Sequence, residues 1–179
     1  MVEEMDESEF IELRRLVGRH EKLVFEAIKA GMVAELPHES QLYAQAVQEH
    51  MHLTHVHNAL EFADLREGTP YEITLEGEPV NPLAHVATHA AVKGQLEQDT
   101  LVRAAFEKMV ATGTSAHHAE HVLGALFLEA EWETAQAVDR KEMEKAQKMY
   151  IRKLQKLVQD SAFRKKLTRQ FTADHSAFE

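Results

Sequence analysis

The sequence predicts an all-α fold, an up-down bundle of four to six helices with a metal site in its core. Residues that favour helix are abundant, and helix breakers are scarce, with 7 Gly and 4 Pro among 179 residues. Apolar residues recur at three- and four-residue steps, which is the spacing of one helix face. A chain of this length can bury one well-formed core, so a single domain over residues 1–179 is expected.

The first predicted helix begins after Asp6 and Ser8, two good N-caps, and ends at Gly31. His20 falls on its apolar face, where a boundary residue with a hydrogen-bond partner is the expected role. The residues of that apolar face are Leu13, Leu16, Val17, Leu23, Val24, Ala27 and Ile28.

A second helix is predicted from about Ser40 to Leu65, and its inward stripe contains His50 and His57, two turns apart. Residues 66–80 break the helical pattern and form a long connection for a bundle; long connections often cover a site. Alternation of apolar and polar residues within this connection predicts a short extended segment at Tyr71, Ile73 and Leu75.

A third helix is predicted to begin at Asn81-Pro82, a good N-cap followed by a good first helical residue. His85 and His89 lie one turn apart on its inward stripe. Asp99-Thr100 is expected to cap a separate short helix.

The next helix is predicted to begin after Thr114-Ser115, and it contains a second pair of histidines one turn apart, His117 and His121. A last long helix is expected from about Arg140 to Val158. Ser161 is expected to cap a short terminal helix.

The two histidine pairs are the strongest functional signal in the chain. Positions i and i+4 share a helix face, so each pair can aim two imidazoles at one point. Two such helices packed antiparallel would bring four imidazoles, common transition-metal ligands, into one core. The chain has no Cys, so its metal ligands must be histidines, carboxylates, amides or water.

Buried carboxylates are expected to complete this site. Glu129 is favoured as an inward acid, and Glu120 is equally well explained as a solvated flank or as a partner that orients an imidazole. The alternative for the whole set is boundary histidines bonded to Glu and backbone groups. The predicted metal ligands are His85, His89, His117 and His121, with His50, His57, Glu120 and Glu129 as further candidates.

The spacing leaves the metal and its chemistry open. A His-rich set in a bundle favours iron over zinc or manganese, in a hemerythrin-like di-iron centre with oxygen or redox chemistry or in a mononuclear three-His site. Zinc would instead favour a metal-activated water and hydrolysis. A non-catalytic metal-binding or sensing protein, and an interaction bundle without metal, are further alternatives. Neither the substrate nor enzyme activity follows from these patterns.

The charge is uneven: residues 1–138 carry 9 basic against 24 acidic residues, and residues 139–179 carry 11 against 6. The acidic body disfavours nucleic-acid binding. The basic end is expected to be a solvated face that pairs with the acidic body. No apolar run reaches the roughly 20 residues of a membrane span, and the start does not resemble a signal peptide, so a cytoplasmic protein is expected. Terminal aromatic residues suggest a homodimer: Phe163, Phe171 and Phe178.

Residues 81–89 read Asn-Pro-Leu-Ala-His-Val-Ala-Thr-His, and residues 117–121 read His-His-Ala-Glu-His. With the flanking residues, these blocks resemble a bacterial domain-of-unknown-function family over about residues 45–158. The flanking matches are Gln95-Leu96, Asp99, Glu129-Ala130, Trp132-Glu133, Tyr150, Leu154 and Leu157, with Glu49-His50 less close.

This resemblance implies a compact helical domain whose His and Glu positions form one common site, and it implies no activity. The chain departs from the family at Ala125, where relatives often carry a Glu one turn after the second histidine of the second block. If that Glu is a ligand in relatives, this site either has lost it or replaces it with Glu129 or a histidine from another helix.

Overall fold

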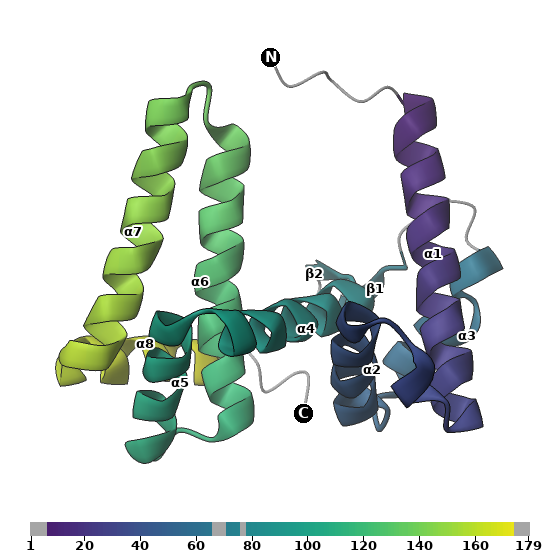
Figure 1. Ribbon diagram of the computed structural model, residues 1–179, viewed down its shortest axis with the longest axis horizontal. Coiled ribbons are helices and arrows are strands. Elements are labelled where there is room, and N and C mark those ends of the chain that lie inside the picture. The colour runs from purple at the N-terminus through teal and green to yellow at the C-terminus, as the bar shows by residue number, and fades with distance from the viewer. Residues whose placement is uncertain (1–6, 66–70, 76–77, 174–179) are drawn as a thin grey trace. The chain divides into compact units, whose positions relative to one another are not determined.

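The computed structural model describes residues 7–65, 71–75 and 78–173 (Figure 1). The described chain is almost entirely helical, which confirms the all-α class. It divides into two compact units, residues 1–90 and 91–179, and each is described here by itself. The single domain and the up-down bundle topology stay predictions.

Unit 1 contains four helices, two 3-10 turns and one small hairpin. Its elements are α1 (Glu7–Ala30), η1 (Val33–Glu35), α2 (His38–His50), α3 (Thr54–Glu61), η2 (Ala63–Leu65), β1 (Ile73–Leu75), β2 (Glu78–Val80) and the first half of α4 (Pro82–Gln98). The strands pair antiparallel, with Ile73 opposite Val80. The expected extended segment is therefore present, as one arm of a hairpin. The core centres on Val24 and Phe25 of α1, both fully buried.

Helix α1 ends where the sequence predicts, because Gly31 takes a left-handed conformation with φ +72°. Its buried face was predicted correctly in the second half, where Val24 is fully buried, and wrongly at Leu16 and Leu23, which are 52% and 56% exposed. The element η2 packs against Gly18 instead. A Cβ at Gly18 would lie 2.5 Å from the carbonyl oxygen of Ala63, so the absence of a side chain sets which face of α1 is covered.

The predicted helix over residues 40–65 is two helices, with a break at residues 51–53, and the prediction was wrong here. Leu53 adopts an extended conformation with φ −84° and ψ 111°. Met51 and Leu53 both pack against the core of unit 1. Residues 51–53 contain neither Gly nor Pro, so local propensity does not predict this break. The packing of the two apolar residues against the core accounts for it.

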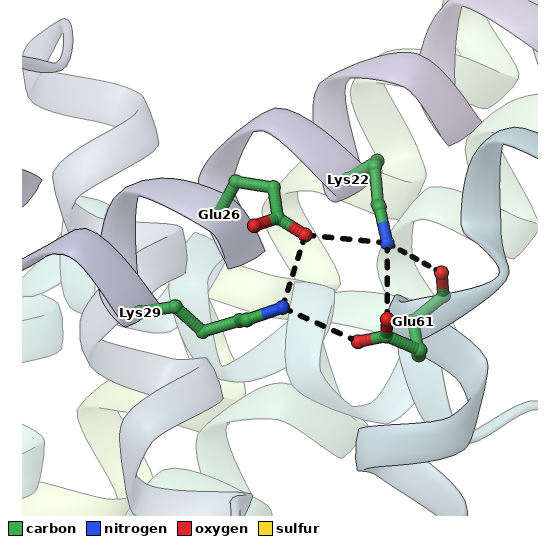
Figure 2. Close-up of polar contacts among 4 residues, drawn as sticks. All are labelled: Lys22, Glu26, Lys29 and Glu61. Carbon is green, nitrogen blue, oxygen red and sulfur yellow. Dashed lines mark hydrogen bonds and ion pairs between the residues drawn. The ribbon is translucent and has the colours of Figure 1, made fainter.

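Four charged residues join the end of α3 to α1 (Figure 2). Lys22 lies 3.3 Å from Glu26 and 3.6 Å from Glu61, and Lys29 lies 3.2 Å and 3.7 Å from the same two carboxylates. The ammonium of Lys22 also donates to the backbone carbonyl of Glu61 at 2.6 Å. In this network cations and carboxylates alternate, and their ion pairs hold the end of α3 against α1.

Unit 2 contains the second half of α4 and four further helices. These are α5 (Thr100–Ala111), α6 (Ala116–Gln136), α7 (Arg140–Gln159) and α8 (Ser161–Ala173). Helices α6 and α7 lie side by side and antiparallel (Figure 1). Their shared core includes Leu123, Leu154 and Leu157.

The helix starts of unit 2 are capped by side chains. Asp99 accepts from the backbone N–H groups of Leu101 and Val102, and Ser115 accepts from that of His118, as the sequence predicts. Helix α8 is capped by Asp160 and not by Ser161.

Of the terminal aromatic residues that suggested a dimer, Phe163 has a side chain that the structure describes. Phe163 packs against the core of unit 2, and the ammonium of Lys156 lies 5.5 Å from its ring centre. The side chain of Phe171 and all of Phe178 lie outside the described residues, so the homodimer stays a prediction. Among the described helices, none has the length and apolar character that a membrane span requires.

Candidate metal centre

Three histidines from two helices meet inside unit 1. His50 is the last residue of α2, and His85 and His89 lie on the first two turns of α4. Asn81 starts α4 as predicted, accepting from the backbone N–H groups of Leu83 and Ala84. His50 and His89 are buried, with 2% and 3% of their surface exposed, and His85 is partly exposed.

The three rings form a nearly equilateral triangle. Their centres lie 4.9 Å apart for His50 and His85, 4.7 Å for His50 and His89, and 4.9 Å for His85 and His89. The Nε2 atoms of His50 and His85 are 3.2 Å apart. Two nitrogens on one tetrahedral metal at ordinary bond lengths are about 3.3 Å apart. Each histidine offers a ring nitrogen within 4.8 Å of the others, so the three can share one ion.

One hydrogen bond orients the His50 ring. Its Nδ1 lies 2.7 Å from the backbone carbonyl oxygen of Ala46, one turn earlier in α2. A carbonyl only accepts, so Nδ1 carries the proton, and the lone pair of a neutral ring is then on Nε2, which faces His85. Metal-bound histidines usually have such a partner on their second nitrogen, because it fixes the tautomer and the ring plane.

His57 does not join this group. It lies on α3, is exposed, and places its ring edge-on to Phe25 at 5.2 Å between ring centres. The break at residues 51–53 explains the difference, because His50 and His57 shared a face only if one helix continued through both. The prediction that they share a stripe was therefore wrong.

The second histidine pair lies in unit 2 on the first two turns of α6. The Nε2 atoms of His117 and His121 are 2.9 Å apart, and their ring centres are 4.4 Å apart. His121 is buried and His117 is partly exposed. The i,i+4 spacing therefore aims both imidazoles at one point, as the sequence predicts.

Of the two carboxylates predicted as further candidate ligands, Glu120 is the buried one and Glu129 is the exposed one. Glu120 is buried, with 8% of its surface exposed, and its Oε1 lies 3.1 Å from the ammonium of Lys93. Glu129 is exposed and pairs with Lys153 at 2.6 Å. The inward orientation expected for Glu129 is wrong, because eight residues after His121 the helix has turned it about 80° off the histidine face.

Within unit 1 the structure brings together His50, His85 and His89, and within unit 2 it brings together His117 and His121. The first group belongs to unit 1 and the second to unit 2, so the prediction that both pairs serve one metal stays a prediction. Sequence reasoning missed the role of Lys93, whose partner is 27 positions away along the chain.

In comparisons with known proteins, no family profile, no curated protein and no solved structure matches the chain. The resemblance to the domain-of-unknown-function family stays a prediction. Function is therefore argued from the residues themselves.

Proposed function

We propose that the protein binds one divalent transition-metal ion in unit 1, on the imidazoles of His50, His85 and His89. The observation that carries this proposal is the His50 ring, held by Ala46 so that its Nε2 faces two imidazoles one turn apart on α4. Buried imidazoles are costly unless their polar atoms are satisfied, and a shared metal satisfies three at once.

The donor set favours a mononuclear site. Three imidazoles without a carboxylate suit zinc or iron(II), whereas di-iron centres in helical proteins rely on carboxylates that bridge two ions. Glu120, the buried acid of unit 2, is neutralised by Lys93. Three protein ligands leave a coordination position for water or a small ligand, which a catalytic site requires. Zinc would supply an activated water there, and iron would add redox chemistry.

A metal-free alternative is a set of neutral histidines. The Nε2–H of His85 would donate to Nε2 of His50, and no ion would be needed. Because this arrangement keeps the same rings close together, metal content and affinity decide between the two.

The test is elemental analysis of tag-free protein, followed by calorimetric titration of the metal-free form with zinc and with iron(II). We expect about one ion per chain, and an affinity at least about 100-fold weaker in His85→Ala, since a direct ligand should matter at least as much as its hydrogen-bonding partners. The matched control is His57→Ala, an exposed histidine of the same unit, which should bind as the unchanged protein does.

Absence of metal binding, or equal affinities in His85→Ala and His57→Ala, would overturn the proposal. His50→Ala, checked for folding by circular dichroism, gives a second variant at the most buried ligand. The double variant His117→Ala/His121→Ala tests unit 2. Unchanged metal content there supports a site confined to unit 1, and loss of the same ion would support the sequence prediction that both pairs serve one metal.

A further inference from the structure

Unit 2 contains a cavity of about 680 Å³ between the α5–α6 turn and α8. Its walls carry only hydroxyl groups, one glycine, one histidine and three permanent cations: Arg164, Lys165 and Arg169. None of the lining residues is acidic or a large apolar residue. Although the chain as a whole carries a net charge of −10, the lining of this cavity is positively charged, so the cavity favours a negatively charged ligand.

Arg164 is the central observation, because its guanidinium is charged and the residue is only 6% exposed. Its Nη1 donates to the backbone carbonyls of Leu157 and Val158, at the end of α7. Among the described residues no carboxylate pairs with it. Carbonyl dipoles at a helix end offset part of the cost of burying a cation, but they leave its net charge uncompensated.

The other two cations follow the same pattern. Lys165 and Arg169 are exposed, and neither forms an ion pair within the described part of the chain. On α7, by contrast, Lys148 pairs with Glu144 and Lys153 with Glu129. Lys153 thus pairs with the acidic body, as expected for the basic end, whereas Lys148 pairs within its own helix and the three cations that line the cavity pair with neither.

The opposite wall of the cavity also favours an anion. It includes the start of α6, a helix of 21 residues, where Ser115 is the N-cap. The backbone N–H groups at the start of this long helix and the hydroxyl of Thr114 can both donate toward a bound oxyanion. This wall and the cations of α8 are separated by more than 40 positions in the sequence and meet only in the folded unit.

We infer that this cavity binds a small phosphomonoester. The fork of a guanidinium matches two phosphate oxygens, and Arg164 and Arg169 each supply one; Lys165 adds a point charge. The cavity exceeds what a bare phosphate fills and lies within the usual range of about 300–1,000 Å³ for small-molecule sites. The ligand therefore carries an organic part besides its phosphate. This inference is independent of the metal site in unit 1.

The test is calorimetric titration of the full chain with phenyl phosphate at low ionic strength, beside benzoate as a singly charged aromatic anion. We expect phenyl phosphate to bind at least about tenfold more tightly than benzoate, because a phosphate dianion accepts more charge-assisted hydrogen bonds. Arg169→Gln should weaken phenyl phosphate binding about tenfold, the loss of one such contact. Lys166→Gln is the matched control, since Lys166 is an exposed neighbouring cation outside the cavity wall.

Arg164→Lys keeps the charge but removes the fork, so it should weaken phenyl phosphate binding while the fold is retained. No preference for phenyl phosphate, or equal effects of Arg169→Gln and Lys166→Gln, would overturn the inference and leave Arg164 as a cap for α7. Vesicles containing phosphatidic acid test the same group on a lipid. Binding to these vesicles without binding phenyl phosphate would also overturn the proposal of a small ligand.

Discussion

The two units differ in the charged groups that they bury. Unit 1 buries imidazoles at its candidate metal centre and leaves the four-residue ion network of Figure 2 partly exposed; among its described residues, Glu21 is the buried carboxylate. Unit 2 buries the imidazole of His121 and, besides it, two fixed charges: Glu120, which pairs with the largely buried Lys93, and Arg164. A neutral imidazole costs less to bury than a fixed charge and keeps a lone pair for a cation. A buried fixed charge needs an opposite charge, from the chain or from a ligand.

Because of this difference, the two proposed sites should also respond differently to pH. Histidines bind metal only when neutral, so acid weakens the site of unit 1. A guanidinium stays charged at every ordinary pH, so acid leaves the cations of the unit 2 cavity unchanged. The two sites therefore select ions of opposite sign by different means.

The buried pair of unit 2 gives the largest effect on stability. Glu120→Gln removes the carboxylate charge that lies 3.1 Å from the largely buried ammonium of Lys93, and we expect the free energy of unfolding to fall by about 3 kcal/mol. Urea denaturation followed by circular dichroism measures the change.

The control is the double variant Lys93→Met/Glu120→Leu, which removes both charges and should recover most of the loss. A single variant within about 0.5 kcal/mol of the unchanged protein, the usual effect of a surface substitution, would show that the pair behaves as an exposed one and would remove the contrast between the units.

Local signals in the sequence were enough to place the starts of α4, α5 and α6 and to put the first histidine pair on one helix face. Asn81-Pro82 marks the start of α4 by a cap and a ring with a fixed φ, and the i,i+4 spacing then puts His85 and His89 on one face. His50, a further candidate ligand in the sequence, lies beside His85 and His89, although its helix is shorter than predicted. These features depend on neighbours within one or two turns.

The remainder depended on contacts between distant segments. The break after α2 follows burial of Met51 and Leu53, which no local residue announces. Of the two candidate acids on α6, the buried Glu120 pairs with Lys93 of α4 and the exposed Glu129 pairs with Lys153 of α7, partners that are distant in the sequence. The cavity joins a turn and a helix far apart in the chain, and its one local hint was the hydroxyl-rich run at residues 112–115.

The contribution of Tyr150 to stability is of intermediate size, and it changes only at alkaline pH. Burial, together with the charge of Asp99, raises the pKa of Tyr150 to about 12. Its hydroxyl donates to Oε1 of Gln95 at 2.8 Å. Because the folded value lies above the unfolded value of about 10, its contribution to stability is complete below pH 10 and is lost as the pH rises toward 12.

Tyr150→Phe should remove this part of the loss of stability at alkaline pH. The tyrosinate absorbance that the unchanged protein shows and the variant lacks should titrate near pH 12. The measurement is the ultraviolet titration of the unchanged protein minus that of Tyr150→Phe. A difference that titrates near pH 10, the ordinary tyrosine value, would show that unit 2 does not hold this group away from water.

The ion network of unit 1 gives the smallest effect. Hydrogen bonds from Lys29 and then Lys22 lower the pKa of Glu26 below its ordinary value of 4.5. A lowered folded pKa stabilises the fold at neutral pH, and this stabilisation is lost as the pH falls through the folded value. Glu26→Gln should therefore lower the melting temperature slightly at pH 7, and the difference should vanish in acid.

High salt should distinguish the exposed network of unit 1 from the buried pair of unit 2. Exposed ion pairs are screened at an ionic strength of about 1 M, whereas buried pairs are screened much less. The effect of Glu26→Gln on the melting temperature should therefore disappear in high salt, and that of Glu120→Gln should persist. Equal salt sensitivity of the two variants would mean that both carboxylates are effectively in water, and the contrast between the exposed network of unit 1 and the buried charge of unit 2 would not hold.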